Sequence, residues 1–264
     1  MTTRSLTQAL LVAAGVDAGA TVEAVGHGES GDLVLRIDAA VPLFAKISGR
    51  PSVTRLAEFE REVSALAWLD GRCGAPRLVW RGEVQGRPAL VMEAVPGVAL
   101  HAVPAGAAGR AAVAAIERLA ELHATPIAEC PFDERLAVKL AVAARRVADG
   151  DFDADQLEAH NVGQSPEALL AELVRNRPAD EDLVVTHGDA CWPNFILRPD
   201  GRVGLIDLGR MGVADRYQDL ALFVRSGARN SPDLDVRALI RRHYPLDRLD
   251  EEKLVFYREL DEFY

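Results

Sequence analysis

The chain has 264 residues and 49% apolar composition, enough to bury a sizeable core as one large domain or as two lobes. Its 40 acidic and 30 basic residues give a formal net charge of −10 at pH 7. This charge argues against nucleic acid or anionic lipid as the main partner and favours a cationic one.

The cysteines and the N-terminus indicate a protein of the reducing cytoplasm. Cys73, Cys130 and Cys191 are far apart and lack the spacing of a zinc site or a redox pair. The apolar stretch 9–16 is short and is followed by Asp17, which favours a surface helix over a secretory signal. No apolar run approaches the ~20 residues needed to span a bilayer. We expect a cytoplasmic monomer or weak dimer that binds neither membranes nor nucleic acid.

The first third of the chain predicts a small β-rich lobe. Strand-like stretches separated by Gly, Asp and Pro residues predict an antiparallel meander, and a helix with one apolar face interrupts it. We expect this nucleotide-binding lobe at 1–94, with a hinge at about 92–97. The expected strands are 21–25, 33–37, 43–47, 77–84 and 88–93, and the helix begins near Leu56.

The remainder, 95–264, predicts a larger and mainly helical lobe for catalysis and substrate binding. Ala/Leu-rich stretches at about 107–123 and 133–148 have helical character, and 183–207 is a short β-rich insertion. The chain ends in an amphipathic helix. The fold class is therefore α+β, with a small antiparallel sheet in one lobe and helices in the other.

The insertion carries the most informative motif. Two apolar strands flank Asp200-Gly201, a strong signal for a hairpin. If these are the two loop residues, counting outward pairs Asn194 with Asp207. Directly opposed residues on antiparallel strands lie about 4.5–5.5 Å apart. We therefore expect an amide oxygen and a carboxylate to meet at the open end of the hairpin, beside Asp189.

These residue types suit phosphoryl transfer. Hard oxygen ligands bind Mg²⁺, which neutralises phosphates, and a separate carboxylate orients and deprotonates the attacking hydroxyl. Asp189, then Asn194, then Asp207-x-Gly follow the kinase catalytic-loop spacing, with Gly188 in place of its arginine. Asp189 is the candidate general base, and Asn194 and Asp207 are the candidate Mg²⁺ ligands. An ordinary polar hairpin is the competing interpretation.

Three runs of sequence, Val184–Cys191, Ile206–Asp219 and Leu260–Tyr264, resemble the aminoglycoside 3′-phosphotransferases. They occur in the family's order, and the similarity extends over nearly the whole chain. The resemblance implies a protein-kinase-like fold and the use of ATP with Mg²⁺, with GTP as an alternative nucleotide. It also implies phosphorylation of the 3′-hydroxyl of kanamycin- or neomycin-like antibiotics, and hence antibiotic resistance.

Lys46 is the only lysine in the first 130 residues, and it lies at the end of an apolar strand. The resemblance makes it the phosphate-binding lysine, a role that suits a compact ammonium group. Phe44, on the same strand face, is positioned to stack on adenine. Glu60 and Glu62 flank the apolar face of the next helix, and only the family pattern selects Glu62 as the partner of Lys46. A merely solvated lysine is the alternative.

Two further segments complete the expected nucleotide site. The glycine-rich turn 26–32 would close over the phosphates, and the resemblance places Ser30 at the contact. Met92, Glu93 and Ala94 would form the hinge, whose backbone groups bind the adenine edge.

An aminoglycoside is a polyamine near neutral pH, so its site requires carboxylates near the catalytic aspartate. The resemblance assigns this role to Asp261, Glu262 and the terminal carboxylate of Tyr264; a solvated, fraying tail is the alternative. In the acidic stretch before residue 159, Asp155 and Glu158 are candidates, against a plain solvated loop.

Arg210 and Arg225 match family arginines near the bound sugar. Buried pairs with Asp219 or Asp215 would explain these arginines equally well.

Two positions depart from the family pattern. Trp192 stands in the catalytic loop where relatives have smaller or acidic residues. Arg229 with Asn230 replaces an acidic pair of some relatives. Both changes would remove or crowd carboxylate contacts to the outer rings of the antibiotic, so we expect a narrower substrate range.

Other functions compete with this one. A kinase of similar fold acting on choline, a fructosamine, homoserine or a macrolide would share the catalytic hairpin but would give the C-terminus no role. A silent nucleotide-binding pseudokinase is disfavoured, because Lys46, Asp189, Asn194 and Asp207 are all chemically competent.

Overall fold

The structure is a computed structural model that describes the chain except for residues 1–2, 18, 28–30, 50–52, 153–156 and 159. It divides into two compact units, Met1–Pro96 and Gly97–Tyr264. This boundary lies inside the segment 92–97 that the sequence marks as a hinge. Among the described residues, no helix combines the length and hydropathy of a membrane span.

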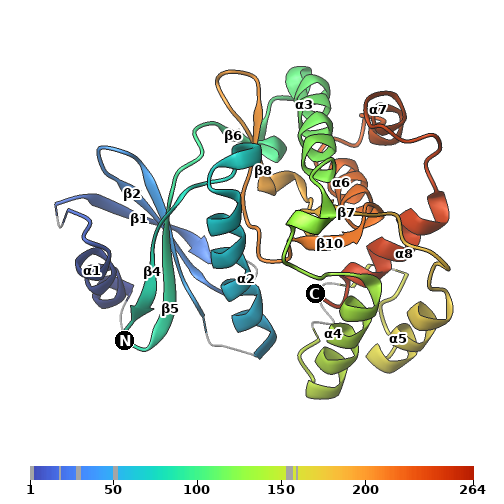
Figure 1. Ribbon diagram of the computed structural model, residues 1–264, viewed down its shortest axis with the longest axis horizontal. Coiled ribbons are helices and arrows are strands. Elements are labelled where there is room, and N and C mark those ends of the chain that lie inside the picture. Colours follow the sequence, from blue (N-terminus) through green and yellow to red (C-terminus); the bar gives the residue numbers. More distant parts are fainter. Residues whose placement is uncertain (1–2, 18, 28–30, 50–52, 153–156, 159) are drawn as a thin grey trace. The chain divides into compact units, whose positions relative to one another are not determined.

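An antiparallel sheet with strand order β1-β2-β3-β5-β4 forms the centre of the first unit. Helix α1 (Thr3–Ala14) covers one face of the sheet and α2 (Val53–Leu69) covers the other (Figure 1). Leu6, Leu10 and Leu11 of α1 pack with alternate strand residues into a buried core. The strands are β1 (Thr21–His27), β2 (Leu33–Asp38), β3 (Leu43–Ile47), β4 (Leu78–Val84) and β5 (Arg87–Glu93), with a short 3-10 helix, η1 (Arg72–Gly74), before β4.

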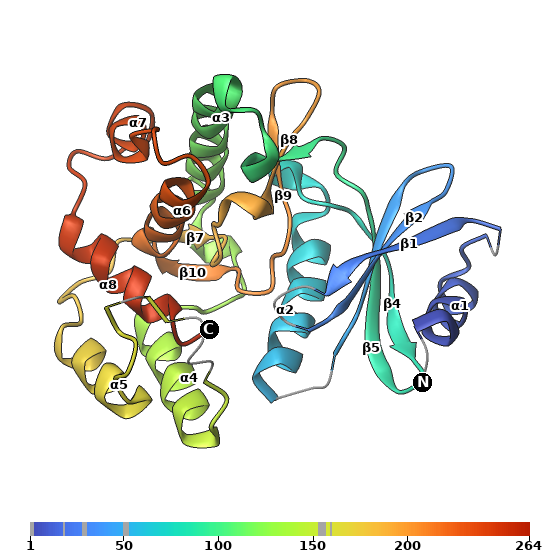
Figure 2. The ribbon, with the colours of Figure 1, turned by 180° about the vertical axis from the view of Figure 1, so that it is seen from behind.

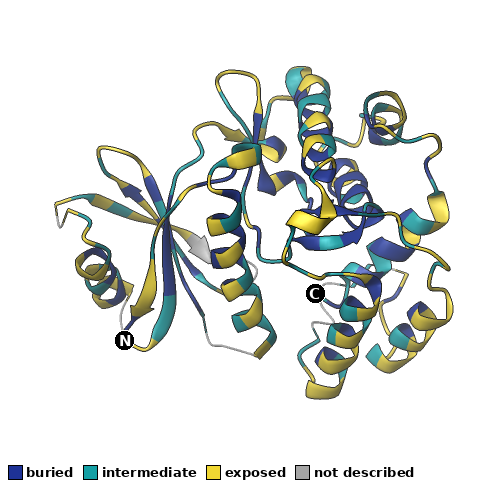
Figure 3. Cartoon of the chain, in the orientation of Figure 1, coloured by how far each residue is buried: buried dark blue, intermediate teal, exposed yellow. Residues whose placement is uncertain are grey.

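Helix α6 (Tyr217–Asn230) is the centre of the second unit. Ten of its 14 residues are buried, so it is surrounded by other elements and appears dark in Figure 3. The other helices expose one face and bury the other, as α3 does with its alanines and leucines. They are α3 (Ala105–His123), α4 (Leu136–Asp149), α5 (Pro166–Arg175), α7 (Val236–His243) and α8 (Glu251–Asp261), with 3-10 turns η2 (Leu100–Ala102), η3 (Ile127–Glu129) and η5 (Trp192–Asn194).

Two small antiparallel sheets interrupt these helices (Figure 2). One pairs β7 (Leu183–Thr186) with β10 (Gly212–Asp215). The other joins β6 (Val98–Ala99), β8 (Phe195–Leu197) and β9 (Val203–Leu205). The predicted β-rich insertion is therefore present, with two additional short strands, β6 and β10.

The predicted register of the β8–β9 hairpin is wrong by one residue. Ile196 pairs with Gly204, and the Arg198 N–H donates to the Arg202 C=O at 2.8 Å across a three-residue loop. Gly201 has φ +80°, the left-handed conformation that such loops place before a bulge. The extra loop residue shifts every pair outward along the hairpin.

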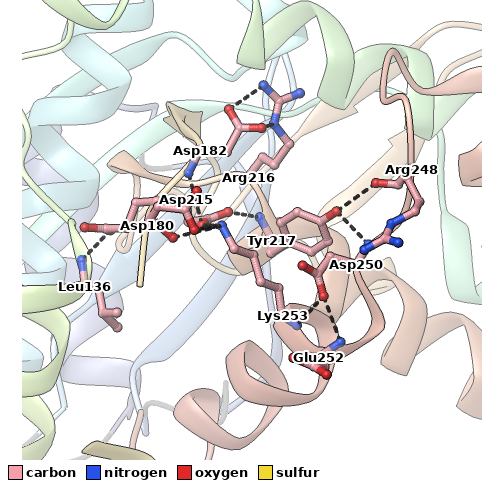
Figure 4. Close-up of polar contacts among 11 residues, drawn as sticks. Leu136, Asp180, Asp182, Asp215, Arg216, Tyr217, Arg248, Asp250, Glu252 and Lys253 are labelled. Atoms are coloured by element: carbon pink, nitrogen blue, oxygen red, sulfur yellow. Dashed lines mark hydrogen bonds and ion pairs between the residues drawn. The ribbon is translucent and has the colours of Figure 1, made fainter. Parts of the chain in front are cut away.

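A buried carboxylate, Asp215, joins β10, α6 and α8 (Figure 4). Its Oδ2 accepts hydrogen bonds from Lys253 Nζ at 2.8 Å and from the Asp182 N–H at 3.1 Å. Its Oδ1 accepts one from the Tyr217 N–H at 2.9 Å. Because Lys253 lies in the first turn of α8, whose N–H groups are capped by Asp250, this cluster fixes where the C-terminal helix begins.

Replacement of Lys253 by methionine should lower the free energy of unfolding by roughly 3 kcal/mol, because it leaves the buried Asp215 charge without its cation. Chemical denaturation measures this effect. Arg237→Met is the matched control: its pair with Glu251 is about half exposed, and the expected loss is below about 1 kcal/mol. Equal losses in the two variants would contradict the role given to Asp215.

Candidate active site

In the first unit, β3 presents Lys46 on the sheet face opposite α1. Leu43, Ala45 and Ile47 are buried in the core with α1, whereas Phe44 and Lys46 alternate to the other face. The shared face expected for Phe44 and Lys46 is therefore observed.

Lys46 forms a two-pronged ion pair with α2. Its Nζ donates to Oε1 and Oε2 of Glu62 at 2.7 and 2.8 Å. The side chains are only 12% and 4% exposed, so solvent screens the pair weakly. Glu60 is exposed and makes no such contact with Lys46 among the contacts of the described residues. The geometry thus selects Glu62, a choice that the helix pattern alone left open.

The residues expected to bind the edge of adenine already have partners within the first unit. Met92 is buried in β5 opposite Phe44. The Ala94 N–H donates to the Pro42 C=O at 2.8 Å, so a nucleotide would have to replace this bond in order to use that N–H. Ser30 lies outside the described residues.

In the second unit, the side chain of Asn194 is hydrogen-bonded to Asp189. The Asn194 Nδ2 donates to Asp189 Oδ2 at 2.9 Å and to the Asp189 C=O at 3.0 Å. Both amide hydrogens of Asn194 are then used, and its Oδ1 remains an acceptor. The 3-10 turn η5 between the two residues brings them together.

Asp207 lies one position beyond Asn194 in the hairpin. The Ile206 N–H donates to the Asn194 C=O at 3.0 Å, and Asp207 follows with φ +62°, a left-handed backbone that is uncommon outside glycine. The Asn194 amide and the Asp207 carboxylate supply the hard oxygens that Mg²⁺ prefers. Among the described residues, no group of three or more His, Cys, Asp or Glu side chains could hold a metal ion.

His187 connects the two sides of this loop. Its Nδ1 lies 3.3 Å from the Asp189 N–H, and its Nε2 lies 3.0 Å from the Ile206 C=O. A ring that accepts at Nδ1 carries its proton at Nε2, so His187 donates to Ile206. The fully buried imidazole therefore fixes Asp189 relative to the residue before Asp207.

Gly188 explains why the loop lacks the arginine of the protein-kinase pattern. Its φ is +87°, and a Cβ at this position would overlap the backbone carbonyl of Arg210. Only glycine fits both constraints.

Asp219, on α6, accepts hydrogen bonds from the backbone of the loop that carries Asp189. Its Oδ2 accepts from the His187 N–H at 2.7 Å, and its Oδ1 accepts from the Gly188 N–H at 2.8 Å. His123 Nε2 lies 2.8 Å from Oδ2, while its Nδ1 lies 2.6 Å from the Tyr244 hydroxyl. Burial alone would raise the pKa of Asp219, but its hydrogen bonds with His123 and with the His187 N–H lower that pKa below the ordinary value. Asp219 is therefore ionised at neutral pH.

Asp261 lies between two arginines. Arg210 Nη1 donates to its Oδ1 at 3.2 Å, and Arg225 Nη2 donates to its Oδ2 at 2.5 Å. Both arginines therefore pair with Asp261, a partner other than the Asp219 or Asp215 of the alternative interpretation. Asp261 is only 10% exposed, so the protein itself already neutralises this carboxylate.

The remaining acids of the expected substrate site also have protein partners. Glu262 accepts from Asn161 Nδ2 at 2.9 and 3.0 Å, and burial raises its pKa above the ordinary value. Glu158 pairs with Arg229 at 2.7 Å on the surface. Asp155 lies outside the described residues.

Trp192 does not crowd the site, contrary to the prediction. Its side chain is 1% exposed, packs on Phe223 with ring centroids 5.8 Å apart, and lies close to Gly227. The Trp192 backbone N–H donates to the Ser226 hydroxyl at 2.9 Å, which ties this turn to α6.

The roles of His123, His187 and Asp219 were not predicted from the sequence. The signal was weak, because each is a polar residue close to apolar residues in the sequence. A buried polar side chain needs a partner, but sequence alone does not name that partner.

The Lys46–Glu62 pair and the Asp189–Asn194 loop are features of a kinase-like phosphotransferase. Comparison with known proteins narrows this class. Residues 20–253 match the model of the phosphotransferase enzyme family, and the chain belongs to that family. It is 41% identical, over 253 residues, to an aminoglycoside 3′-phosphotransferase of Streptomyces fradiae; the match covers 91% of this chain and 94% of that protein.

Solved structures agree with this assignment. An aminoglycoside-3′-phosphotransferase of type VIII has a TM-score of 0.83 and 39% identity, covering 98% of this chain and 99% of its own. The aminoglycoside phosphotransferase APH(3'')-Id from Streptomyces rimosus, in complex with ADP and streptomycin, has a TM-score of 0.80 and 28% identity, covering 100% and 99%. The predicted kinase-like α+β fold and the family resemblance are confirmed.

Proposed function

We propose that this chain transfers the γ-phosphoryl group of ATP to the 3′-hydroxyl of a kanamycin- or neomycin-type aminoglycoside and thereby confers resistance in the cytoplasm. The observation that carries the proposal is the 2.9 Å hydrogen bond by which Asn194 holds the Asp189 carboxylate in a kinase-type loop. The chain that carries this loop is 41% identical to an aminoglycoside 3′-phosphotransferase. GTP is the alternative nucleotide. Cys73, Cys130 and Cys191 form no disulfide with one another in the described structure, which suits a reducing compartment.

Asp189 acts as the general base in this reaction. Its carboxylate accepts the proton of the substrate hydroxyl as the new oxygen–phosphorus bond forms and the bond to the ADP leaving group breaks. Asn194 holds the carboxylate on one side, and His187 holds the loop backbone. Asn194 Oδ1 and the Asp207 carboxylate would hold Mg²⁺, which neutralises phosphate charge when it is bound.

The first unit binds the nucleotide. Lys46, oriented by Glu62, donates to the α- and β-phosphates, and Phe44 stacks on adenine. Met92 and the backbone of Ala94 line the adenine edge, and Ser30 contributes to the phosphate loop.

The acids near the C-terminus bind the ammonium groups of the antibiotic. Glu262 and Tyr264 are the direct ligands, with Asp155 and Glu158 at the periphery. Asp261 contributes to this site together with Arg210 and Arg225, because each of its two carboxylate oxygens accepts a hydrogen bond from one of these arginines.

An ADP-release assay with kanamycin, neomycin, streptomycin, choline and a macrolide tests the function, and NMR of the product locates the phosphate. We expect turnover with kanamycin or neomycin and phosphate on the 3′-hydroxyl. Turnover with choline or the macrolide alone would refute the proposal. Turnover with streptomycin alone would favour the second candidate, a streptomycin kinase, which the likeness to the streptomycin-bound structure supports.

Arg229 should restrict the substrate range, because it already neutralises Glu158. An exposed pair of this kind contributes up to about 1 kcal/mol, so Arg229→Ala should raise kcat/KM for neomycin by about 2–5-fold and that for kanamycin, which has fewer amino groups, by less. Arg237→Ala, which removes another exposed ion pair, is the control. If wild type uses kanamycin, neomycin and butirosin equally well, the restriction does not exist.

A further inference from the structure

Strand β9, which leads to Asp207, lies at the edge of its small sheet. The order of the described strands is β6-β8-β9, so β9 pairs with a strand on one side. In an antiparallel pair, residues that exchange backbone hydrogen bonds alternate with residues whose backbone groups point away from the partner strand. The Arg198 N–H donates to the Arg202 C=O near the loop. At the open end, the Ile206 N–H donates to the Asn194 C=O. The alternation therefore directs the C=O of the residue after Arg202 away from β8.

That residue is Val203, and Arg118 of α3 is the partner of its carbonyl. Arg118 Nε donates to the Val203 C=O at 2.6 Å. Helix α3 packs against both β8 and β9 (Figure 2). Val203 is 1% exposed, so its backbone has little access to solvent. A buried carbonyl without a donor is costly, and a hydrogen bond from a charged donor is among the stronger ones.

An ordinary ion pair on a helix surface does not explain the placement of Arg118. Its Nη1 donates to Oε2 of Glu121 at 2.5 Å, but Glu121 is 60% exposed and such pairs contribute little. The Arg118 side chain is only 11% exposed. Its Nε, the donor nearest the backbone, is directed at the strand. The contact with Val203 is therefore the one that accounts for the burial of Arg118.

A second side chain holds the other end of β9. His187 Nε2 lies 3.0 Å from the Ile206 C=O. Arg118 and His187 thus bond to carbonyls at opposite ends of this segment, and Asp207 follows it directly. Because β9 has only three residues, backbone pairing alone fixes its position weakly. The two side-chain bonds therefore determine where Asp207 begins.

We propose that Arg118 is a positioning residue for the two candidate Mg²⁺ ligands, Asn194 and Asp207, and that it acts on them through β9. A shift of β9 moves the Asp207 carboxylate relative to the Asn194 amide. Groups outside a metal site commonly orient its ligands in this way, and losing them lowers metal affinity. The part concerning Mg²⁺ rests on the proposed function, whereas the anchoring of β9 does not.

Arg118→Met and Arg118→Gln isolate the hydrogen bond to Val203. The amide nitrogen of glutamine is the same number of bonds from the backbone as Nε of arginine, so it can donate to the same carbonyl. In methionine a methyl group takes that place and cannot donate. Both variants lose the charge and the contact with Glu121, so a difference between them reports the bond to β9. Arg110→Met changes an exposed arginine of the same helix and is the control.

Hydrogen exchange tests the anchoring of β9 without nucleotide, metal or antibiotic. The Ile206 N–H should exchange at least about 10-fold faster in Arg118→Met than in wild type, but within about 3-fold of wild type in Arg118→Gln. If Arg118→Met does not fold, Arg118→Lys takes its place. Its ammonium lies one bond further along the side chain, so exchange should be at least about 3-fold faster than in wild type. Wild-type exchange rates in the variant tested would refute the anchoring.

Calorimetric titration with ADP tests the positioning of the metal ligands. The quantity measured is the ratio of the ADP dissociation constant in EDTA to that in Mg²⁺. Arg118→Met, or Arg118→Lys in its place, should lower this ratio at least about 5-fold, and Arg118→Gln and Arg110→Met should change it less than about twofold. An unchanged ratio would overturn the proposal even if β9 exchanges faster, because Arg118 would then serve stability only.

The wild-type protein separates this proposal from the proposed function. A wild-type ratio near one, or no binding of ADP, would overturn the role of Arg118 toward Mg²⁺. A protein that binds ADP with Mg²⁺ but phosphorylates no aminoglycoside would instead refute the proposed function. The ratio and the exchange rates would still decide the role of Arg118.

Discussion

Replacement of Asp189 by asparagine is expected to lower kcat by about 10²–10⁴-fold, the usual contribution of a positioned general base. Asparagine keeps the size of the side chain and an oxygen that can accept the Asn194 hydrogen bond, but it cannot accept the substrate proton. The KM values for ATP and aminoglycoside should therefore remain close to those of wild type, because geometry is retained and only the proton acceptor is lost.

Steady-state and single-turnover phosphorylation assays measure this effect on the chemical step. Asp182→Asn is the matched control: it removes a carboxylate of the same unit that is 46% exposed and pairs with Arg216. Its kcat should stay within about twofold of wild type. Near-normal turnover by Asp189→Asn would show that another group takes the proton, and the assignment of Asp189 would then be wrong.

Much of the fold was predictable from local patterns. The alternating strands of the first unit, the apolar face of α2 and the amphipathic C-terminal helix α8 all occur where residue periodicity placed them. The strands β6 and β10 have only two and four residues, too few to establish a period. They exist because the long-range partners β8 and β7 are present.

The hairpin register shows where local reasoning fails. An Asp-Gly pair fits a two-residue loop, but Pro199 favours the first corner of a type I turn and Gly201 then takes the left-handed position of a three-residue loop. The two loops differ by one residue, and one residue decides whether Asn194 faces Ile206 or Asp207. Dipeptide chemistry alone does not distinguish them.

Long-range partners were the other unpredictable feature of the site. Arg210 and Arg225 lie 51 and 36 residues from Asp261 along the chain. The packing of α6 against α8 brings Arg225 to Asp261, and the turn before β10 brings Arg210 there. Likewise, the helix pattern left Glu60 and Glu62 open as partners of Lys46, and only the observed hydrogen bonds from Lys46 to Glu62 decide between them. The identity of the candidate catalytic residues was readable from motif spacing, whereas the groups that hold them were not.

Asp219→Asn should be the most damaging substitution outside the reacting groups. The carboxylate accepts three hydrogen bonds, from the His187 N–H, the Gly188 N–H and the His123 imidazole. An amide has one acceptor oxygen, so in either orientation its NH₂ group faces at least one of these donors. Each buried group left without a partner costs about 1–3 kcal/mol of unfolding free energy, which chemical denaturation measures.

The same substitution should lower kcat by about 10–100-fold, because the bonds to His187 and Gly188 set the position of Asp189 and a displacement of about 1 Å has an effect of that order. Because the pKa of Asp219 lies below the ordinary value, its stabilisation is complete at neutral pH and is lost only in acid, as the pH falls through the lowered folded-state pKa. Lys253→Met separates positioning from general instability, since it also weakens a buried carboxylate cluster but makes no bond to the catalytic loop among the described contacts. If both variants lose the same activity per folded molecule, Asp219 serves only the stability of the fold. If only Asp219→Asn loses activity, the buried carboxylate positions the general base.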